Sequence, residues 1–254
     1  MDKLNEILKG FESISLSEIE DVKLMDRVDT KFSFHREILN DVLTKLSDEY
    51  YVLTINDNRY GSYRSLYFDY DNFKFYHDHH NRKNHRFKIR FREYIDSQLY
   101  FLEIKEKRKG RTKKTRIQVN SFEEELSMKS KSFIDEHLPV SNLLEASLWN
   151  QYKRITLVSK NKQERLTLDI DLSYTWEGQE KNYPTLVIAE VKQKKRDRTS
   201  HFFKVMRSLE IRPYRISKYC IGTIKMHGKK KVKYNRFKEE LLKLKLVTNA
   251  TRNR

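Results

Sequence analysis

The segment Arg86-Phe-Lys-Ile-Arg-Phe-Arg92 alternates basic and apolar side chains without interruption. Successive side chains of a β-strand point to opposite faces of a sheet, so this segment predicts a strand with one cationic and one apolar face. The same division recurs in residues 27–32, 101–107, 165–171 and 186–192. One such strand is typical of any half-exposed sheet, but five in one chain predict a continuous charged face.

These charged faces carry mostly long cations with a few isolated carboxylates, unlike the mixed polar residues of an ordinary solvent face. We therefore predict an α+β fold: a closed antiparallel β-barrel of about eight strands, with the charged faces lining a central tunnel and helices packed outside on the apolar faces. The predicted strands are 27–34, 63–69, 86–95, 99–107, 112–119, 154–159, 165–171 and 185–193. The predicted helices are 1–25, 36–47, helices within 121–151 around Pro139, and 235–247.

The composition indicates one folded domain with an anionic partner. The chain has 254 residues, and its 53 Lys and Arg against 36 Asp and Glu give a net charge of +17. Because glycine and proline are scarce, no linker is evident, and we expect a single domain over residues 1–254 with its core at about 20–225. The single cysteine and the lack of a signal-like or membrane-spanning segment favour a cytoplasmic protein.

Two Glu-x-Lys pairs, Glu103 with Lys105 and Glu190 with Lys192, place a carboxylate and an ammonium group on the same face of a strand. Hard divalent cations bind carboxylate oxygens, while neighbouring cationic groups neutralise phosphate oxygens. The pattern is compatible with a metal-phosphate site, although such pairs are also common as plain cross-strand ion pairs.

Taken together, several segments resemble the triphosphate tunnel metalloenzymes, and within them the VTC-type polyphosphate polymerase domain. The resemblance covers roughly residues 20–225 and is carried by residues 26–32, 65–69, 75–79, 87–92, 102–105, 189–192 and 217–220. It implies a phosphate chain bound in the tunnel, Mn²⁺ or Mg²⁺ as the cofactor, and ATP, triphosphate or polyphosphate as the partner. Since family members act beside membrane proteins, it is also compatible with membrane association through a partner protein.

The resemblance also implies roles for individual residues. Glu190 would be the metal ligand, and the phosphate ligands with catalytic roles would be Lys31, Arg90, Arg92, Lys105, Arg154 and Lys218. Further substrate-binding residues, expected from the resemblance or from their position on the charged faces, are Arg27, Lys88, Glu103, Lys114, Arg165, Lys192 and Arg215. Within residues 111–116 the resemblance does not decide whether Lys113, Lys114 or Arg116 points into the tunnel. The first strand has Arg27, Asp29 and Lys31 where the wider superfamily carries alternating glutamates, which favours the polymerase branch.

The predicted activity is transfer of the γ-phosphate of ATP to a growing polyphosphate chain, with release of ADP. One alternative is a triphosphatase of the same fold, in which Glu103 would orient water. The other is a non-catalytic module that binds polyphosphate or nucleotide. Nucleic acid is disfavoured as a specific partner, because Phe87, Ile89 and Phe91 point away from the basic face where bases would stack.

Overall fold

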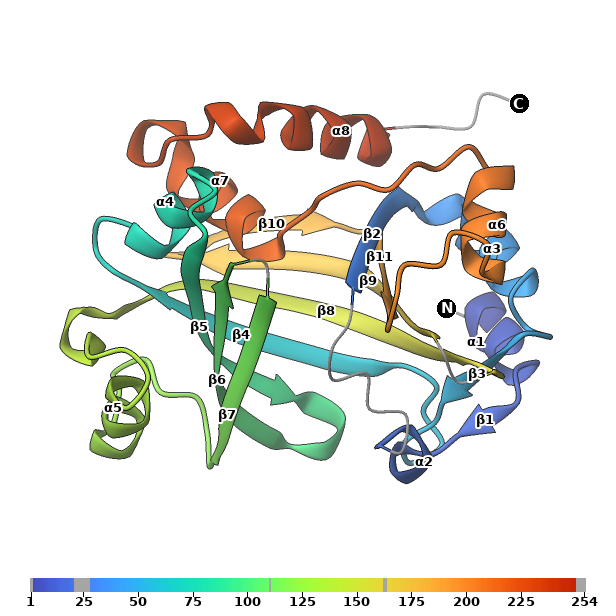
Figure 1. Ribbon diagram of the computed structural model, residues 1–254, viewed down its shortest axis with the longest axis horizontal. Helices are drawn as coiled ribbons and strands as arrows, with labels where there is room; N and C mark the ends of the chain where they lie inside the picture. Colours follow the sequence, from blue (N-terminus) through green and yellow to red (C-terminus); the bar gives the residue numbers. More distant parts are fainter. Residues whose placement is uncertain (1, 21–27, 110, 162–163, 250–254) are drawn as a thin grey trace.

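The computed structural model describes residues 2–20, 28–109, 111–161 and 164–249 (Figure 1). Its helices are α1 (Asp2–Lys9), α2 (Leu16–Glu20), α3 (Leu39–Thr44), α4 (Lys74–His80), α5 (Met128–Asp135), α6 (His201–Ser208), α7 (Lys218–Lys231) and α8 (Lys238–Asn249). Its strands are β1 (Ser13–Ile14), β2 (Val28–His35), β3 (Tyr50–Leu53), β4 (Gly61–Asp69), β5 (His85–Tyr94), β6 (Leu99–Arg108), β7 (Arg111–Val119), β8 (Glu145–Ser159), β9 (Glu164–Trp176), β10 (Gln179–Tyr183) and β11 (Leu186–Gln193).

The strands form one sheet with the order β2-β11-β9-β8-β4-β5-β6-β7, and neighbours along this path are antiparallel. Glu190 on β11 and Lys31 on β2 lie close enough to Lys105 on β6 for their charges to act on its pKa. Since these strands are several positions apart along the path, the sheet is curled. The predicted closure of the barrel is wrong: among the described residues β2 pairs with β11 alone and β7 with β6 alone.

Both free edges of the sheet have a physical reason to stay apart. The backbone amide of Tyr214 donates to the carbonyl oxygen of Lys31 (2.6 Å), so the segment before α7 occupies the free edge of β2. The other edge, β7, has the sequence Arg-Thr-Lys-Lys-Thr-Arg-Ile-Gln-Val and is mostly exposed. Charged side chains along an edge strand oppose further pairing. The result is a curled, open sheet.

Helices cover the apolar face of the sheet, as predicted. At one end, α1, α3 and α6 pack on apolar residues of β2, β8, β9 and β11, and Figure 1 shows these three helices grouped together. At the other end, α5 contributes Phe133 and Ile134 to a core with Phe91, Leu102 and Ile104. The C-terminal helix prediction is confirmed by α8, with Leu244 buried.

The sequence prediction failed mainly over residues 121–151, where only α5 and a short 3₁₀ turn at Ser141–Leu143 are helical. Residues from Glu145 onward belong instead to the 15-residue strand β8. This strand runs through the middle of the sheet and is packed on both faces, so its apolar residues do not alternate clearly. The predicted helix 1–25 contains α1, β1 and α2 in its described part. Strands β3 and β10 and helices α4, α6 and α7 were not predicted.

Helix α7 covers part of the inner face of the sheet. It packs on Leu148, Tyr152 and Tyr174, together with Tyr67. At Gly222 a Cβ would lie 2.6 Å from side-chain atoms of Leu148 and Tyr174, so only glycine permits this close packing. The buried carboxylate of Asp69 accepts the Tyr219 hydroxyl and the backbone amides of α4 (2.8 and 2.9 Å). These contacts fix the N-terminal end of α7 against the sheet.

Candidate functional site

The inner face of the sheet and the start of α7 bring most of the predicted site residues together. We call this set the cationic face, and it consists of Lys31, Lys88, Arg90, Arg92, Lys105, Lys114, Arg154, Arg165, Lys192 and Lys218. Register places the strand residues on one side of the sheet, because directly paired residues of neighbouring antiparallel strands point to the same side. Lys31 pairs with Glu190, Lys88 with Lys105, and Arg154 with Asp169.

Three carboxylates of the inner face are each held by two cations, and exposed Asp29, which pairs with Lys192 in the register, lies on the same side. The side chain of Glu103 is 2% exposed, that of Asp169 is 3% exposed and that of Glu190 is 17% exposed. Burial alone would raise the pKa of each carboxyl, but the neighbouring cations outweigh it and hold all three pKa values below their usual range. All three are therefore firmly ionised, and they neutralise only part of the cationic charge around them.

Glu103 is the partner of Arg90 and Lys114. Arg90 donates to it through Nε (2.9 Å) and Nη2 (2.6 Å), while the third nitrogen of the guanidinium donates to the Tyr67 hydroxyl (3.1 Å). The ammonium of Lys114 pairs with the other Glu103 oxygen. The orientation of Arg90 is thereby fixed in advance, which lowers the entropy lost when the group binds a ligand.

Asp169 holds a second pair of cations. Arg154 binds it in a bidentate manner (2.6 and 2.8 Å), and the ammonium of Lys218, the first residue of α7, pairs with Oδ2. The Arg154 guanidinium and that of Arg92 both lie over the rings of Tyr63 and Tyr152, which are stacked with centroids 5.4 Å apart. Arg92 also donates to the Tyr152 hydroxyl (2.8 Å). The aromatic pair thus spaces the two guanidinium groups.

Glu190 is the residue predicted to hold a metal. One oxygen accepts from Lys192 (2.6 Å), and the other lies 3.4 Å from the ammonium of Lys31. No group of three or more His, Cys, Asp or Glu suited to a metal ion occurs within residues 2–20, 28–109, 111–161 and 164–249. A single partly exposed carboxylate nevertheless fits Mg²⁺ or Mn²⁺, since such ions are commonly held by one or two carboxylates together with substrate phosphate and water.

The start of α7 contacts the cationic face at three points. Lys31 donates to the carbonyl oxygen of Ile216 (3.1 Å), Lys88 donates to the hydroxyl of Ser217 (3.0 Å), and Lys218 pairs with Asp169. Ser217 also accepts from the amide of Cys220 as the N-cap of the helix. Sequence alternation could not reveal these contacts, because the helix and its position were not predicted.

The structure resolves the ambiguity in residues 111–116. Lys114 pairs with Lys105 and Arg116 with Glu103, so both point to the inner side, and Arg116 lies over the ring of Phe101 (4.4 Å). Lys113 pairs with Glu106 on the opposite side. Arg215 is exposed. Burial is the main cause that lowers the pKa values of Arg86 and Lys107, and the nearby charge of Arg215 lowers both further. Arg27 lies outside the described residues.

Burial on the cationic face lowers the pKa of three ammonium groups toward neutrality, with Lys114 and Lys192 at about 8 and Lys88 lower still. Burial and neighbouring cations lower the pKa of Lys88 to about 7, against a smaller opposing effect of Cys220.

Because a bound polyanion favours the charged form of Lys88, triphosphate binding should strengthen as pH falls through about 7, by up to about tenfold per pH unit on the alkaline side. Comparing wild type with Lys88→Met by calorimetry between about pH 6 and about pH 9 isolates this group from the titration of the ligand. Lys113→Met on the opposite side is the control; an unchanged pH profile in Lys88→Met would contradict the assignment.

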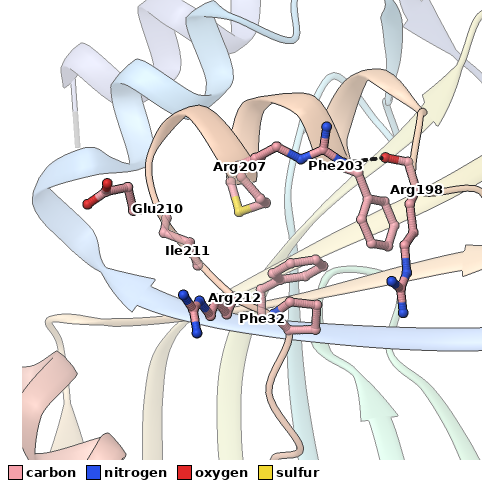
Figure 2. Close-up of a pocket in the computed structure, with 9 residues that line it drawn as sticks. Phe32, Arg198, Phe203, Arg207, Glu210, Ile211 and Arg212 are labelled. Atoms are coloured by element: carbon pink, nitrogen blue, oxygen red, sulfur yellow. Dashed lines mark hydrogen bonds between the residues drawn. The ribbon is translucent and has the colours of Figure 1, made fainter.

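A separate cavity of about 610 Å³ lies on the other side of β2, away from the cationic face (Figure 2). Phe32 forms part of its lining, and it alternates with Lys31, which points to the cationic face. No helix in the described part of the chain is both long and apolar enough to cross a bilayer.

Comparisons with known proteins agree with this architecture. Among solved structures, the protein HpAC1 from Hippeastrum is similar, with a TM-score of 0.50 and 10% sequence identity. The match covers 78% of this chain and 97% of HpAC1. A dominant triphosphatase activity is described for HpAC1. A protein from Pyrococcus horikoshii has a TM-score of 0.46 and 11% identity, over 78% of this chain and 99% of that one. At 10% identity the likeness to HpAC1 concerns the fold alone.

A search of curated proteins gave no match. The family model of the VTC domain matches residues 26–227, which is most of the chain and includes every predicted site residue. The match spans all the strands that carry the cationic face and the start of α7. The chain therefore belongs to the VTC domain family.

Proposed function

We propose that this protein is a metal-dependent polyphosphate polymerase that transfers the γ-phosphate of ATP to the end of a polyphosphate chain. The observation that carries the proposal is the arrangement of the cationic face, where oriented guanidinium and ammonium groups from β2, β5, β8, β11 and α7 surround one side of the curled sheet. Such groups match the oxygens of a phosphate chain in number and geometry. Membership of the VTC family supports the same substrate class.

Binding requires an exchange of partners within the cationic face. Arg154 and Lys218 now neutralise Asp169, and Arg90 and Lys114 neutralise Glu103. A triphosphate brings several negative charges and competes for these cations. Arg92 forms no salt bridge within the described residues and donates to the hydroxyls of Ser65 and Tyr152, so its charge is less fully engaged. Phosphate oxygens thus take over contacts that are already oriented.

The transfer step needs charge stabilisation more than proton transfer. A terminal oxygen of the polyphosphate attacks the γ-phosphorus, the bond from that phosphorus to the β,γ-bridging oxygen breaks, and ADP leaves with the electron pair. Arg90, Arg92 and Arg154 stabilise the charge on the transferring group and on the leaving oxygen. Mn²⁺ or Mg²⁺ held by Glu190 and by phosphate oxygens would add further neutralisation of that charge when bound.

The state of the carboxylates favours transfer to phosphate over hydrolysis. Attack by water requires a base, whereas a phosphate oxygen is already anionic. Glu103, Asp169 and Glu190 are weak bases, because their pKa values are lowered and their oxygens are engaged by cations. Triphosphatase activity, as described for HpAC1, is the second candidate. In that case Glu103 would have to leave Arg90 or Lys114 before it could orient water.

The product of the reaction distinguishes these functions. Purified protein is incubated with ATP and Mn²⁺ or Mg²⁺, and ADP, free phosphate and acid-labile polymer are resolved separately. The proposal predicts ADP and polymer. Free phosphate without polymer would instead assign a triphosphatase, and tight triphosphate binding without turnover would assign a binding module.

Asp169 is expected to limit triphosphate affinity, because it occupies Arg154 and Lys218 in the free protein. Replacing it by Asn keeps the shape and removes the competing charge, so we expect tripolyphosphate to bind about tenfold more tightly, or about 1.4 kcal/mol. The unfolding midpoint of the ligand-free protein should fall, since two cations lose their partner. Calorimetric titration and thermal unfolding check both effects. Weaker binding by Asp169→Asn would mean that the carboxylate instead orients the two cations for phosphate.

A further inference from the structure

A second concentration of cations lies outside the cationic face, on the loop that follows β11 and around the cavity behind β2. We define the outer basic site as Lys194, Lys195, Arg196, Arg198, Arg207 and Arg212. All six side chains belong to exposed residues. Within the described part of the chain none of them forms an ion pair, in contrast to most cations of the cationic face.

The outer basic site begins where the cationic face ends. Lys192 pairs with Glu190, and the loop starts after the next residue, Gln193. The side chain of Gln193 donates to the carbonyl of Asp197 and accepts from its amide (both 3.0 Å). These two bonds fold the loop back onto the end of the strand. Lys194, Lys195 and Arg196 therefore project at its tip, and Arg198 stays next to the strand end.

The cavity of about 610 Å³ extends this site (Figure 2). Its floor includes Phe32, Phe203 and Met206, whose exposed fractions are only 1%, 7% and 1%. These three side chains already pack in the hydrophobic core. Its rim carries Arg198, Arg207 and Arg212. Figure 2 shows Arg198 and Arg212 on either side of Phe32.

Over the described ranges of the chain, the cationic side chains of the rim are free of carboxylate partners, and one of them is held in a fixed orientation. The Arg207 guanidinium donates to the carbonyl oxygen of Arg198 (3.3 Å), which orients it and leaves its other nitrogens unused. The one carboxylate in the lining, Glu210, points away from Arg198 and Arg207 in Figure 2. Asp197, the acidic residue of the loop, is engaged by Thr199 through its amide (2.7 Å) and hydroxyl (2.6 Å). Exposed, unpaired cations so close together repel one another, and a polyanion removes that repulsion.

We propose that the outer basic site binds linear polyphosphate that extends beyond the cationic face, so that a long chain contacts both surfaces at once. This inference rests on the proposed substrate class of the cationic face and adds a second binding site to it. A short triphosphate occupies the cationic face alone. A chain of many phosphates continues past Lys192, along the loop tip and onto the rim of the cavity.

The test compares two ligands and two matched variants. The first variant, Arg198→Gln/Arg207→Gln/Arg212→Gln, removes the rim cations. The second, Lys181→Gln/Lys225→Gln/Lys230→Gln, removes the same charge from exposed residues of β10 and α7. Binding of inorganic tripolyphosphate and of long-chain polyphosphate of about 100 phosphates is measured at several salt concentrations.

The rim variant should bind tripolyphosphate like wild type and long-chain polyphosphate at least about tenfold more weakly, with a salt dependence shallower by about two ions. The control variant should bind both ligands like wild type. Equal long-chain affinity in the rim variant, or an equal loss in both variants, would overturn the outer site. Failure of wild-type protein to bind tripolyphosphate would instead contradict the proposed function.

Discussion

Replacing Glu190 by Gln is expected to lower metal-dependent turnover of ATP by at least about 100-fold while tripolyphosphate still binds without metal. Glu190 is the partly exposed carboxylate between Lys31 and Lys192, and its lowered pKa keeps it ionised at neutral pH. The amide of Gln retains the size of the side chain but supplies no negative charge for Mn²⁺ or Mg²⁺. Lys31 and Lys192 lose an anionic partner and remain available for phosphate.

The measurement is ADP release over a range of Mn²⁺ and Mg²⁺ concentrations, together with calorimetric titration of tripolyphosphate in metal-free buffer. Glu180→Gln, on the exposed strand β10, is the matched control and should behave like wild type. Wild-type turnover in Glu190→Gln would remove Glu190 from the metal site. Loss of metal-free tripolyphosphate binding would show that the carboxylate shapes the cationic face itself.

Replacing Arg90 by Ala is expected to have the largest effect on phosphate binding and on stability together. Arg90 makes two charged hydrogen bonds to Glu103, whose side chain is 2% exposed, and a third to Tyr67. Truncation leaves Glu103 with Lys114 as its remaining partner among the pairs described, so the free energy of unfolding should fall by about 3 kcal/mol. Loss of a guanidinium contact to phosphate should weaken tripolyphosphate binding by about 100-fold, or about 2.7 kcal/mol.

Denaturant unfolding and calorimetry measure these two losses separately. Lys113→Ala, on the same sheet but pointing to the other side, should change neither quantity beyond about 0.5 kcal/mol. Arg90→Lys should restore part of the stability and little of the binding, because an ammonium cannot form the bidentate contact. If Arg90→Ala is destabilised but binds tripolyphosphate with wild-type affinity, Arg90 is a structural residue and not a phosphate ligand.

The alternation of charged and apolar residues predicted β5, β6, β7 and β11 with boundaries accurate to one residue, whereas β9, predicted at 165–171, extends to Trp176. Strand β5 was predicted at 86–95 and is found at His85–Tyr94, and the predicted segment 185–193 corresponds to β11. Alternation carries this information because a polar and an apolar environment select different residues at every second position. The same reasoning placed Lys31, Arg90, Arg92 and Glu190 on one side of the sheet, as the register confirms. Arg154 lies on this side too, but it was expected from the family resemblance and not from alternation.

The remaining features depend on contacts that no local pattern encodes. Strand β8 is apolar on both faces where α7 and the outer helices cover it, so Leu148 and Tyr152 gave no alternation. The free edge of β2 is occupied through a backbone hydrogen bond from Tyr214 to Lys31, and side-chain patterns do not report a backbone contact between residues so far apart in the sequence. The pairing of each inner carboxylate with two cations likewise joins distant strands, as in Asp169 with Arg154 and Lys218.

The central claim is that the cationic face of the curled sheet is a triphosphate site, and titration of inorganic tripolyphosphate into metal-free protein tests it most directly. We predict saturable binding of one tripolyphosphate per chain that weakens as salt increases and is much tighter than binding of orthophosphate. This binding should be about 100-fold weaker in Arg90→Ala and unchanged in Lys113→Ala. Binding no tighter than that of orthophosphate, or equal in both variants, would contradict the account.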